Sequence, residues 1–228
     1  YQSETKAEHA KYFKIYHYDQ GVTLLEIDMS KKTGRKAAGK KWKKSSETSG
    51  LNPAEQEQAE LYLNKVVKYL IVPENAEIPA GLDKEVVVVK QPADHIYAGT
   101  NKIISAIDGL GQLEKVTTVG VKKAKCKNET IKEKMKNKEV VYAGTSGKLN
   151  YKKLVKNKCN LALVSSGVLP KKGSSKKAAK KKLRKYQKMT EKMTLLQMPV
   201  IVDRSKDEKN KQAQEEWQKV YQVILGCQ

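Results

Sequence analysis

A chain of 228 residues is long enough for one main domain with a small appendage. Its 46 Lys and Arg against 25 Asp and Glu give a formal net charge of +21, which favours an anionic partner such as nucleic acid, phospholipid or an acidic ligand. No apolar run approaches the ~18 residues that span a bilayer. We therefore expect no membrane-spanning helix. Because the cysteines also lack the spacing of zinc ligands, we expect no metal site.

The first part of the chain predicts a β-hairpin followed by a polar segment. Residues 12–18 and 22–28 alternate between apolar and polar on either side of Asp19-Gln20-Gly21, as hairpin strands do. The lysine-rich residues 30–50 lack an apolar period and predict a loop. Asn52-Pro53 predicts the start of a short helix that ends near residue 63. Residues 69–73 predict a strand that joins the hairpin.

The remainder of the chain alternates between short apolar runs and amphipathic stretches. The runs cover residues 86–89, 116–120, 140–144, 161–165 and 199–203. Because parallel strands are joined through crossover helices, this alternation predicts an α/β fold with an open, mainly parallel sheet and flanking helices. We therefore divide the chain into residues 1–85, a hairpin, basic loop and short helix that pack on the lobe, and residues 86–228, an α/β lobe.

Several segments between and after these runs predict helices. Apolar residues at helical spacing place helices at residues 102–113, 131–137, 151–157 and 212–225. The very basic residues 171–192 have a composition that favours a helix. Since only Ala178, Ala179, Leu183 and Tyr186 are apolar in its basic core, we expect this helix to bury little.

Small and polar residues follow the strands, where open α/β sheets bind their ligands. Glycines in such turns let backbone amides approach a ligand closely. The turns lie at residues 97–100, 120, 143–147, 165–167 and 203–205. The turn around Gly144 is no phosphate-binding loop, because Gly147 stands too close to Gly144 and Leu149 replaces the required Ser or Thr. No dinucleotide-binding glycine motif occurs either.

Catalytic motifs are missing from the sequence. His9, His17 and His95 have no Ser or Cys near them in a nucleophile motif. We therefore expect no enzymatic activity, no resident cofactor and no metal. His95 precedes Tyr97 and is the histidine best placed to contact a ligand.

Lysine dominates the basic residues, and a run of lysines usually forms a solvated face. We interpret residues 31–44 and 176–185 in this way. The cations that follow strand ends differ, because their charges would surround one rim of the sheet and attract an anionic ligand. They are Lys122, Lys123, Lys148, Arg204 and Lys206.

Several motifs follow one another in a characteristic order along nearly the whole chain. They are Tyr12-Phe13-Lys14-Ile15, residues 69–74, residues 86–100, Asp108-Gly109-Leu110-Gly111, residues 140–144, residues 199–205, and Glu216-Trp217 leading into Tyr221 and Leu225-Gly226. Their order and spacing together resemble the class III periplasmic-binding-protein-like family, the solute-binding lipoproteins of ABC importers for iron siderophores, haem and cobalamin. The likeness is greatest to those of Gram-positive gut anaerobes.

That family folds as two α/β lobes joined by a long helix, with the ligand in the cleft between them. The resemblance implies that this chain is the N-terminal lobe alone, because it stops where the linking helix would begin. It further implies an iron chelate, haem or cobalamin-like ligand, an ABC permease and ATPase complex as partners, and the missing second lobe. The expected location is the extracellular face of the cell membrane, through a lipid anchor that this soluble chain lacks.

The resemblance and the strand-end turns together predict the ligand contacts. Tyrosines would stack on or coordinate the ligand, hydroxyls and turn amides would donate hydrogen bonds to it, and cations would offset its charge. The expected binding residues are Tyr97, Gly99, Thr100, Lys122, Tyr142, Thr145, Ser146, Ser166 and Arg204. Two features depart from the family: the basic insertion at residues 31–50, and the absence of an acid from residues 171–185, where family members carry one that engages permease arginines.

Two other classes of function compete with this interpretation. A basic nucleic-acid-associated α/β protein would use the lysine segments as electrostatic contacts and would be retained on DNA in a steeply salt-dependent way. The scarcity of arginine and aromatic residues in those segments disfavours it. A small α/β enzyme would depend on a cleft His or Asp, and no spacing in the sequence supports one.

Overall fold

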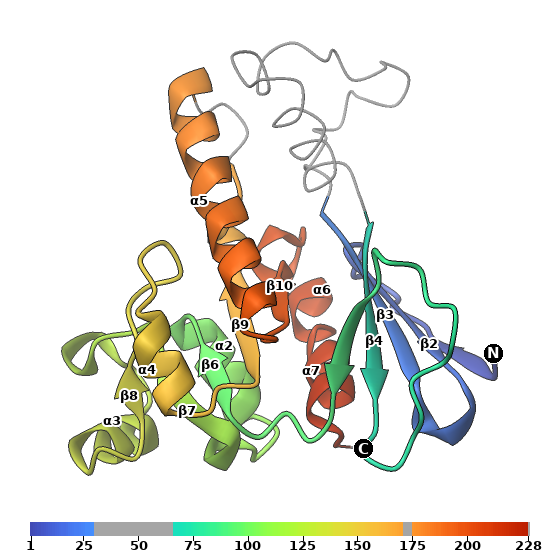
Figure 1. Cartoon of the computed structure of the whole chain (residues 1–228), viewed down its shortest axis with the longest axis horizontal. Coiled ribbons are helices and arrows are strands. Elements are labelled where there is room, and N and C mark those ends of the chain that lie inside the picture. Colours follow the sequence, from blue (N-terminus) through green and yellow to red (C-terminus); the bar gives the residue numbers. More distant parts are fainter. Residues whose placement is uncertain (30–65, 171–174, 228) are drawn as a thin grey trace.

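The computed structural model describes residues 1–29, 66–170 and 175–227, which form two sheets and their helices (Figure 1). The predicted loop at residues 30–50 and the predicted helix at residues 52–63 lie outside the described residues. Among the described helices, none is both long enough and apolar enough to cross a membrane. In Figure 1 the two sheets occupy opposite sides of the molecule, and α6 (Lys211–Glu215) and α7 (Gln218–Leu225) lie between them.

The first sheet has the strand order β1-β2-β3-β4-β5. Its strands are β1 (Ser3–Thr5), β2 (Phe13–His17), β3 (Thr23–Asp28), β4 (Val66–Val72) and β5 (Val87–Lys90). The predicted hairpin is confirmed as the antiparallel pair β2 and β3, joined by a turn in which Gln20 and Gly21 both have positive φ. The predicted strand after it is confirmed as β4, which pairs with β3.

The parallel sheet has the strand order β10-β9-β6-β7-β8, and all its described pairings are parallel. Its strands are β6 (Ile96–Ala98), β7 (Val116–Val119), β8 (Val141–Tyr142), β9 (Leu161–Ser165) and β10 (Val200–Asp203). The predicted fold class is confirmed: the chain is an α/β protein with a mainly parallel sheet, flanking helices and an antiparallel N-terminal hairpin. This arrangement is compatible with one lobe of a bilobal protein.

The position of the run 86–89 corrects one expectation. We expected it in the parallel sheet, but β5 pairs with β4, with Tyr69 opposite Val87. The parallel sheet instead gains β6, which the sequence suggested only as a strand-end turn. A continuous valine run fits either sheet, because it has no polar face to show which partner it needs. As a result the first sheet extends to Lys90, beyond the residue at which the sequence divides the chain.

The helices begin at polar caps that the sequence supplies. Thr100, Asn128 and Asn150 accept backbone hydrogen bonds at the starts of α2 (Asn101–Asp108), α3 (Glu129–Lys136) and α4 (Tyr151–Lys156). The helices predicted at residues 131–137 and 151–157 are confirmed as α3 and α4. The helix predicted at residues 102–113 is confirmed in its first part only, because α2 ends at Asp108. The single closing helix predicted at residues 212–225 is wrong in detail, because the chain forms α6 and α7 with Trp217 between them.

Helix α5 (Lys176–Leu195) buries more than expected. A stripe at spacings of three and four residues is almost fully buried, and it consists of Ala179, Leu183, Tyr186, Met189 and Met193. The prediction that this helix buries little is therefore wrong. That prediction is based on the basic core of the helix alone. Met189 and Met193 lie beyond this core and continue the apolar stripe for two further turns.

The last residue of β10 and the segment that follows it hold the two sheets together. We call residues 203–208 the junction loop. The Glu208 carboxylate accepts hydrogen bonds from the backbone N–H of Lys11 (3.0 Å) and Tyr12 (3.1 Å) and from Trp217 Nε1 (3.2 Å). Asp203 accepts from Tyr221 Oη at 2.9 Å, and burial next to this carboxylate raises the pKa of Tyr221 well above its usual value. The N-terminal segment, α7 and β10 are thus fixed to one another.

Arg204 completes the junction loop. Its Nε lies 3.0 Å from Asp207 Oδ2, its guanidinium lies 4.0 Å from the centroid of the Tyr12 ring, and it donates to the backbone oxygen of Asp28. On the same side Phe13 packs edge-on against Trp217, with ring centroids 5.3 Å apart. One hydrophobic core cluster contains residues from both sheets. The junction loop therefore closes a core that the two sheets share.

Replacing Glu208 with alanine tests the importance of the junction loop. The variant Glu208→Ala leaves the buried Trp217 Nε1–H and two part-buried backbone N–H groups without an acceptor, so we expect the free energy of unfolding to fall by about 3 kcal/mol. Urea unfolding followed by tryptophan fluorescence measures the change. The matched control is Glu215→Ala at an exposed position of α6, with an expected loss below about 0.5 kcal/mol. Equal effects of the two variants would contradict the assigned role.

The neighbouring carboxylate of Glu216 predicts a pH dependence of stability. Burial alone would raise its pKa, but hydrogen bonds from the backbone N–H groups of Ala10, His9 and Glu8 outweigh this, so the pKa lies below its usual value. A carboxyl with a lowered folded pKa stabilises the protein above its unfolded pKa and loses this contribution as the pH falls through the folded value.

We therefore expect Glu216→Gln to be less stable than the parent chain at pH 7, and the difference to shrink as the pH falls below about 4.5. Urea unfolding at a series of pH values measures both curves. Glu215→Gln, at the adjacent position at the end of α6, is the control and should show no comparable convergence. A difference for Glu216→Gln that stays constant down to the acid limit would contradict the assignment.

Candidate ligand-binding site

A cavity of about 530 Å³ lies at the carboxyl ends of β6 and β9. We call it the strand-end cavity. β6 is central in the parallel sheet, with β7 on one side and β9 on the other, so the chain changes direction across the sheet at this point. Open α/β sheets bind ligands at such switch points, and pockets of this size suit small molecules. The lining residues are Gly99, Thr100, Thr145, Ser146, Gly147, Ser165, Gly167, Val168, Ala178, Lys181, Lys182, Lys185 and Tyr186.

Gly99 forms the floor of the cavity at the end of β6. Its backbone N–H donates to the oxygen of Leu163 at 2.9 Å. A Cβ at this position would lie 2.9 Å from that oxygen and 3.1 Å from Ser146 Oγ. Glycine therefore allows the β9 backbone and the turn after β8 to meet here. Thr100, the next residue, caps α2 by accepting from the N–H of Ile103 at 3.4 Å.

Tyr97 lies beneath this floor and fixes the turn that follows β8. It is fully buried, and its hydroxyl donates to the backbone oxygen of Gly144 at 2.9 Å and lies 3.5 Å from Ser146 Oγ. Burial raises the pKa of Tyr97 to about 12, so the hydroxyl keeps its proton at neutral pH. The residue orients Ser146 toward the cavity and does not line it itself.

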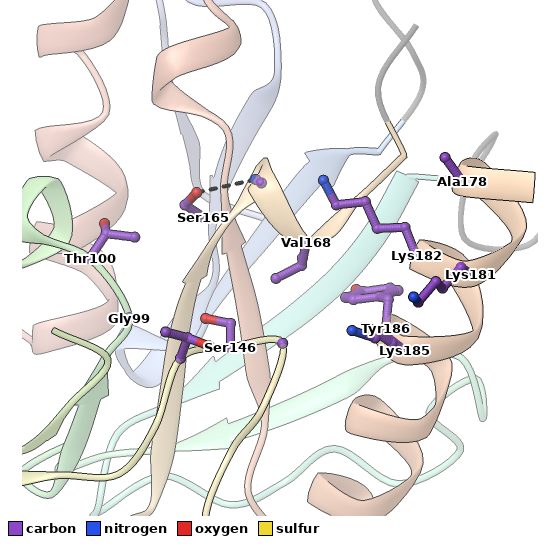
Figure 2. A pocket seen from close by; sticks show the side chains of 13 residues that line it. Gly99, Thr100, Ser146, Ser165, Val168, Ala178, Lys181, Lys182, Lys185 and Tyr186 are labelled. Carbon is purple, nitrogen blue, oxygen red and sulfur yellow. Dashed lines mark hydrogen bonds between the residues drawn. The ribbon is translucent and has the colours of Figure 1, made fainter. Parts of the chain in front are cut away.

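Ser165 supplies a directed hydrogen-bond donor from the end of β9. Its Oγ accepts from the N–H of Gly167 at 3.1 Å, drawn in Figure 2, and from Lys206 Nζ at 3.1 Å. A hydroxyl has one proton and two acceptor lone pairs. Since both lone pairs are engaged, the proton of Ser165 is left to donate to a molecule in the cavity.

Helix α5 forms the opposite wall with basic side chains. Figure 2 shows Lys182 and Lys185 extending from α5 toward the strand ends, with Tyr186 and Lys181 next to them. Tyr186 belongs to the buried stripe, so it fixes this face of the helix over the cavity. Among the described residues, no carboxylate lines the cavity. Three lysines in a lining that holds no described carboxylate raise the positive potential of the cavity, which favours an anion.

Of the nine expected binding residues, the structure brings only part of the set to the strand-end cavity. Gly99, Thr100, Thr145 and Ser146 line the strand-end cavity, and Tyr97 lies directly beneath it. The remaining four do not line it. Lys122 is exposed after β7, Tyr142 is half-buried in β8, and Ser166 is buried beside the lining residue Ser165.

Arg204 is almost fully buried in the junction loop, where it contacts Asp207, Tyr12 and Asp28. The carboxyl end of β10 thus serves the contact between the sheets. His95 does not line the strand-end cavity either, and its Nδ1 lies 2.8 Å from the Asp94 carboxylate.

The lining residues that the sequence did not indicate come mainly from α5. Lys181, Lys182, Lys185 and Tyr186 belong to the run that we interpreted as a solvated face. A signal was present, since Met189 and Met193 continue the spacing of Leu183 and Tyr186 and show that one side of the helix docks. That signal predicts a docked face but does not say which strand ends it covers.

No cluster of three or more His, Cys, Asp or Glu side chains suited to a metal ion occurs in the described parts of the chain. The cavity instead offers hydroxyls, backbone amides of glycine-bearing turns, and amines. Its chemistry suits the recognition of oxygen acceptors and negative charge.

In comparisons with known proteins, no family model, no curated protein and no solved structure matches this chain.

The role of Tyr97 predicts the effect of removing its hydroxyl. The variant Tyr97→Phe loses the hydrogen bond to Gly144, so we expect the free energy of unfolding to fall by about 1 kcal/mol and the turn that carries Ser146 to exchange its amide hydrogens faster. Urea unfolding and hydrogen exchange measure the two effects. Tyr142→Phe, in half-buried β8, is the control. Unchanged exchange in the turn of Tyr97→Phe would contradict the proposed support.

Proposed function

We propose that this chain is the ligand-binding lobe of an extracellular solute-binding protein of an ABC importer, and that it binds an iron siderophore, haem or a cobalamin-like ligand without catalysing a reaction. The observation that carries the proposal is the strand-end cavity. It lies at the switch point of the parallel sheet, and it is lined by hydroxyls and lysines with no carboxylate among its described lining.

The charges of the cavity favour the anionic members of this ligand class. Lys181, Lys182 and Lys185 face the space from α5, and Ser165 offers its proton from the opposite wall. Hydrogen bonds in which one partner is charged are shorter and stronger than neutral ones. A chelate with carboxylate or catecholate oxygens therefore gains more from this cavity than a neutral ligand of the same size.

The surroundings of the lining hydroxyls support binding over turnover. A serine nucleophile needs a neighbouring general base. The described lining contains no His, Asp or Glu, and the amine next to Ser165 donates its hydrogen bond to the serine oxygen. Tyr97 is buried and holds its proton. These hydroxyls are suited to orienting a ligand.

The proposal includes the partners that the family resemblance implies. A second lobe would cover the strand-end cavity, and transport would require the ABC permease and ATPase. A single lobe provides part of the ligand's contacts, so its affinity for a chelate would be lower than that of a closed pair. The location outside the cell, with a lipid anchor, belongs to the same proposal.

Nucleic-acid association is the second candidate, and one surface favours it. Residues 122–158 are rich in lysine and hold only Glu129, Glu133 and Glu139 as acids. These residues form β8, α3 and α4, which lie together at one edge of the molecule (Figure 1). The same residues contain no arginine, and Tyr142 and Tyr151 are their only aromatic residues, so they lack the forked donors and stacking groups of most nucleic-acid readers.

Charge reversal in α5 tests the proposed ligand site. We expect haem or a ferric tris-catecholate to raise the melting temperature, and Lys181→Glu/Lys185→Glu to weaken that binding about tenfold, because it replaces attraction by repulsion. Thermal shift and absorption titration measure the binding. Lys188→Glu, an exposed lysine of α5 that does not line the cavity, is the control and should bind as the parent chain does.

The ligand screen also includes a ferric hydroxamate and cobalamin, and it is repeated on a chain extended by a second lobe. If both forms leave every ligand unbound, the solute-binding proposal is wrong. Retention on DNA that falls steeply with salt and is unaffected by Lys181→Glu/Lys185→Glu would instead support the nucleic-acid candidate through the α3 and α4 surface.

A further inference from the structure

A second, larger cavity of about 700 Å³ lies between β4 and β5 of the first sheet and the C-terminal half of α5. We call it the valine cavity. Its apolar lining consists of Val67, Tyr69, Ile78, Val86, Val87, Val88, Pro92, Met198, Pro199 and Val200, and its polar lining of Lys84, Lys90, Gln91, Asn160, Tyr186, Thr190, Thr194 and Gln197. The solute-binding proposal does not use this space.

The floor of the valine cavity is apolar because of the register of β4 and β5. Tyr69 lies opposite Val87, and Val67 shares the face of Tyr69 because side chains two residues apart in a strand point the same way. Tyr69 is almost fully buried, and its hydroxyl donates to the backbone oxygen of Val200 at 3.0 Å. Its polar atom is thus engaged, and the ring itself forms part of the floor.

The amides at the rim of the cavity are engaged by the protein itself. Gln91 Nε2 donates to the backbone oxygens of Val223 and Ile224 at 2.9 and 3.3 Å. Asn160 Nδ2 donates to the oxygen of Pro92 and to the Asp94 carboxylate at 3.0 and 2.9 Å. These hydrogen bonds fix the shape of the rim. They connect the segment after β5 with α7, and the segment before β9 with the loop before β6.

Two lysines line the valine cavity. Lys84 precedes β5 and Lys90 ends it, and both side chains are exposed. Neither forms an ion pair with any residue of the described ranges, and no carboxylate occurs in the described lining. An apolar floor with two exposed amines and no carboxylate in the described lining is complementary to a molecule with an apolar body and a negative end.

We infer that the valine cavity is a second binding site, and that it takes a small amphipathic anion such as a medium-chain carboxylate. The apolar chain covers Val67, Tyr69 and Val87, and the carboxylate meets Lys84 or Lys90. The site is separate from the strand-end cavity, because the N-terminal half of α5 lines one and its C-terminal half lines the other, and Tyr186 is the residue that lines both. Binding here does not require the solute-binding proposal to be correct.

Dodecanoate is the probe that tests this inference on the whole chain. We expect isothermal titration to show saturable binding of dodecanoate, and dodecylamine, with the same apolar chain and the opposite charge, to bind about tenfold or more weakly. The surface variant Lys84→Glu/Lys90→Glu should lose about tenfold in dodecanoate affinity. Lys188→Glu and Lys181→Glu/Lys185→Glu, which leave the lining of the valine cavity unchanged, should bind as the parent chain does.

A filled cavity provides an independent test. Thr190→Trp places a large side chain into the space from α5, and we expect it to abolish dodecanoate binding while haem or ferric chelate binding at the strand-end cavity stays as in the parent chain. Equal affinity for dodecanoate and dodecylamine, or dodecanoate binding that survives both Lys84→Glu/Lys90→Glu and Thr190→Trp, would overturn the inference. Loss of dodecanoate binding in Lys181→Glu/Lys185→Glu would move the site to the strand-end cavity and overturn it as well.

Discussion

The junction loop at residues 203–208 is the constraint on which the rest of the structure depends. Glu208 accepts hydrogen bonds from the N-terminal segment and from Trp217, and Asp203 accepts one from Tyr221. Arg204 is held between Asp207 and the Tyr12 ring. Buried charges are tolerated only where such partners satisfy them, and removing one partner leaves the other unpaired. This requirement fixes how the first sheet, α7 and the parallel sheet meet.

One consequence concerns the place of the ligand site. The carboxyl end of β10 contacts the first sheet, so the strand ends left to face a cavity are those of β6, β8 and β9. Glycine at position 99 lets two turns approach each other there, and Tyr97 supports them from below. Helix α5 then covers these ends, because its stripe from Ala179 to Met193 is buried. The lysines beside that stripe become the charged wall of the strand-end cavity.

The same helix lines two cavities of different chemistry. Its N-terminal half, with Lys181 and Lys185, lines a space surrounded by hydroxyls. Its C-terminal half, with Thr190 and Thr194, lines a space floored by valines. Both cavities have cations and no described carboxylate in their lining, which agrees with a formal net charge of +21. Part of the excess positive charge thus lies at the two cavities.

The sequence by itself determined the types of element and their faces. The alternation of short apolar runs with amphipathic stretches predicted the parallel α/β sheet, the Asp19-Gln20-Gly21 turn predicted the hairpin, and the strand-end turns contained Gly99, Thr100, Thr145 and Ser146 of the strand-end cavity. Local periodicity carries this information because it depends on neighbours in the chain. Only the tertiary structure decided that β5 joins the first sheet, that Arg204 is buried, and that α5 covers the strand ends. Each of these choices rests on contacts between residues far apart in the chain, and a valine run, a single arginine or a lysine-rich helix is locally compatible with more than one partner.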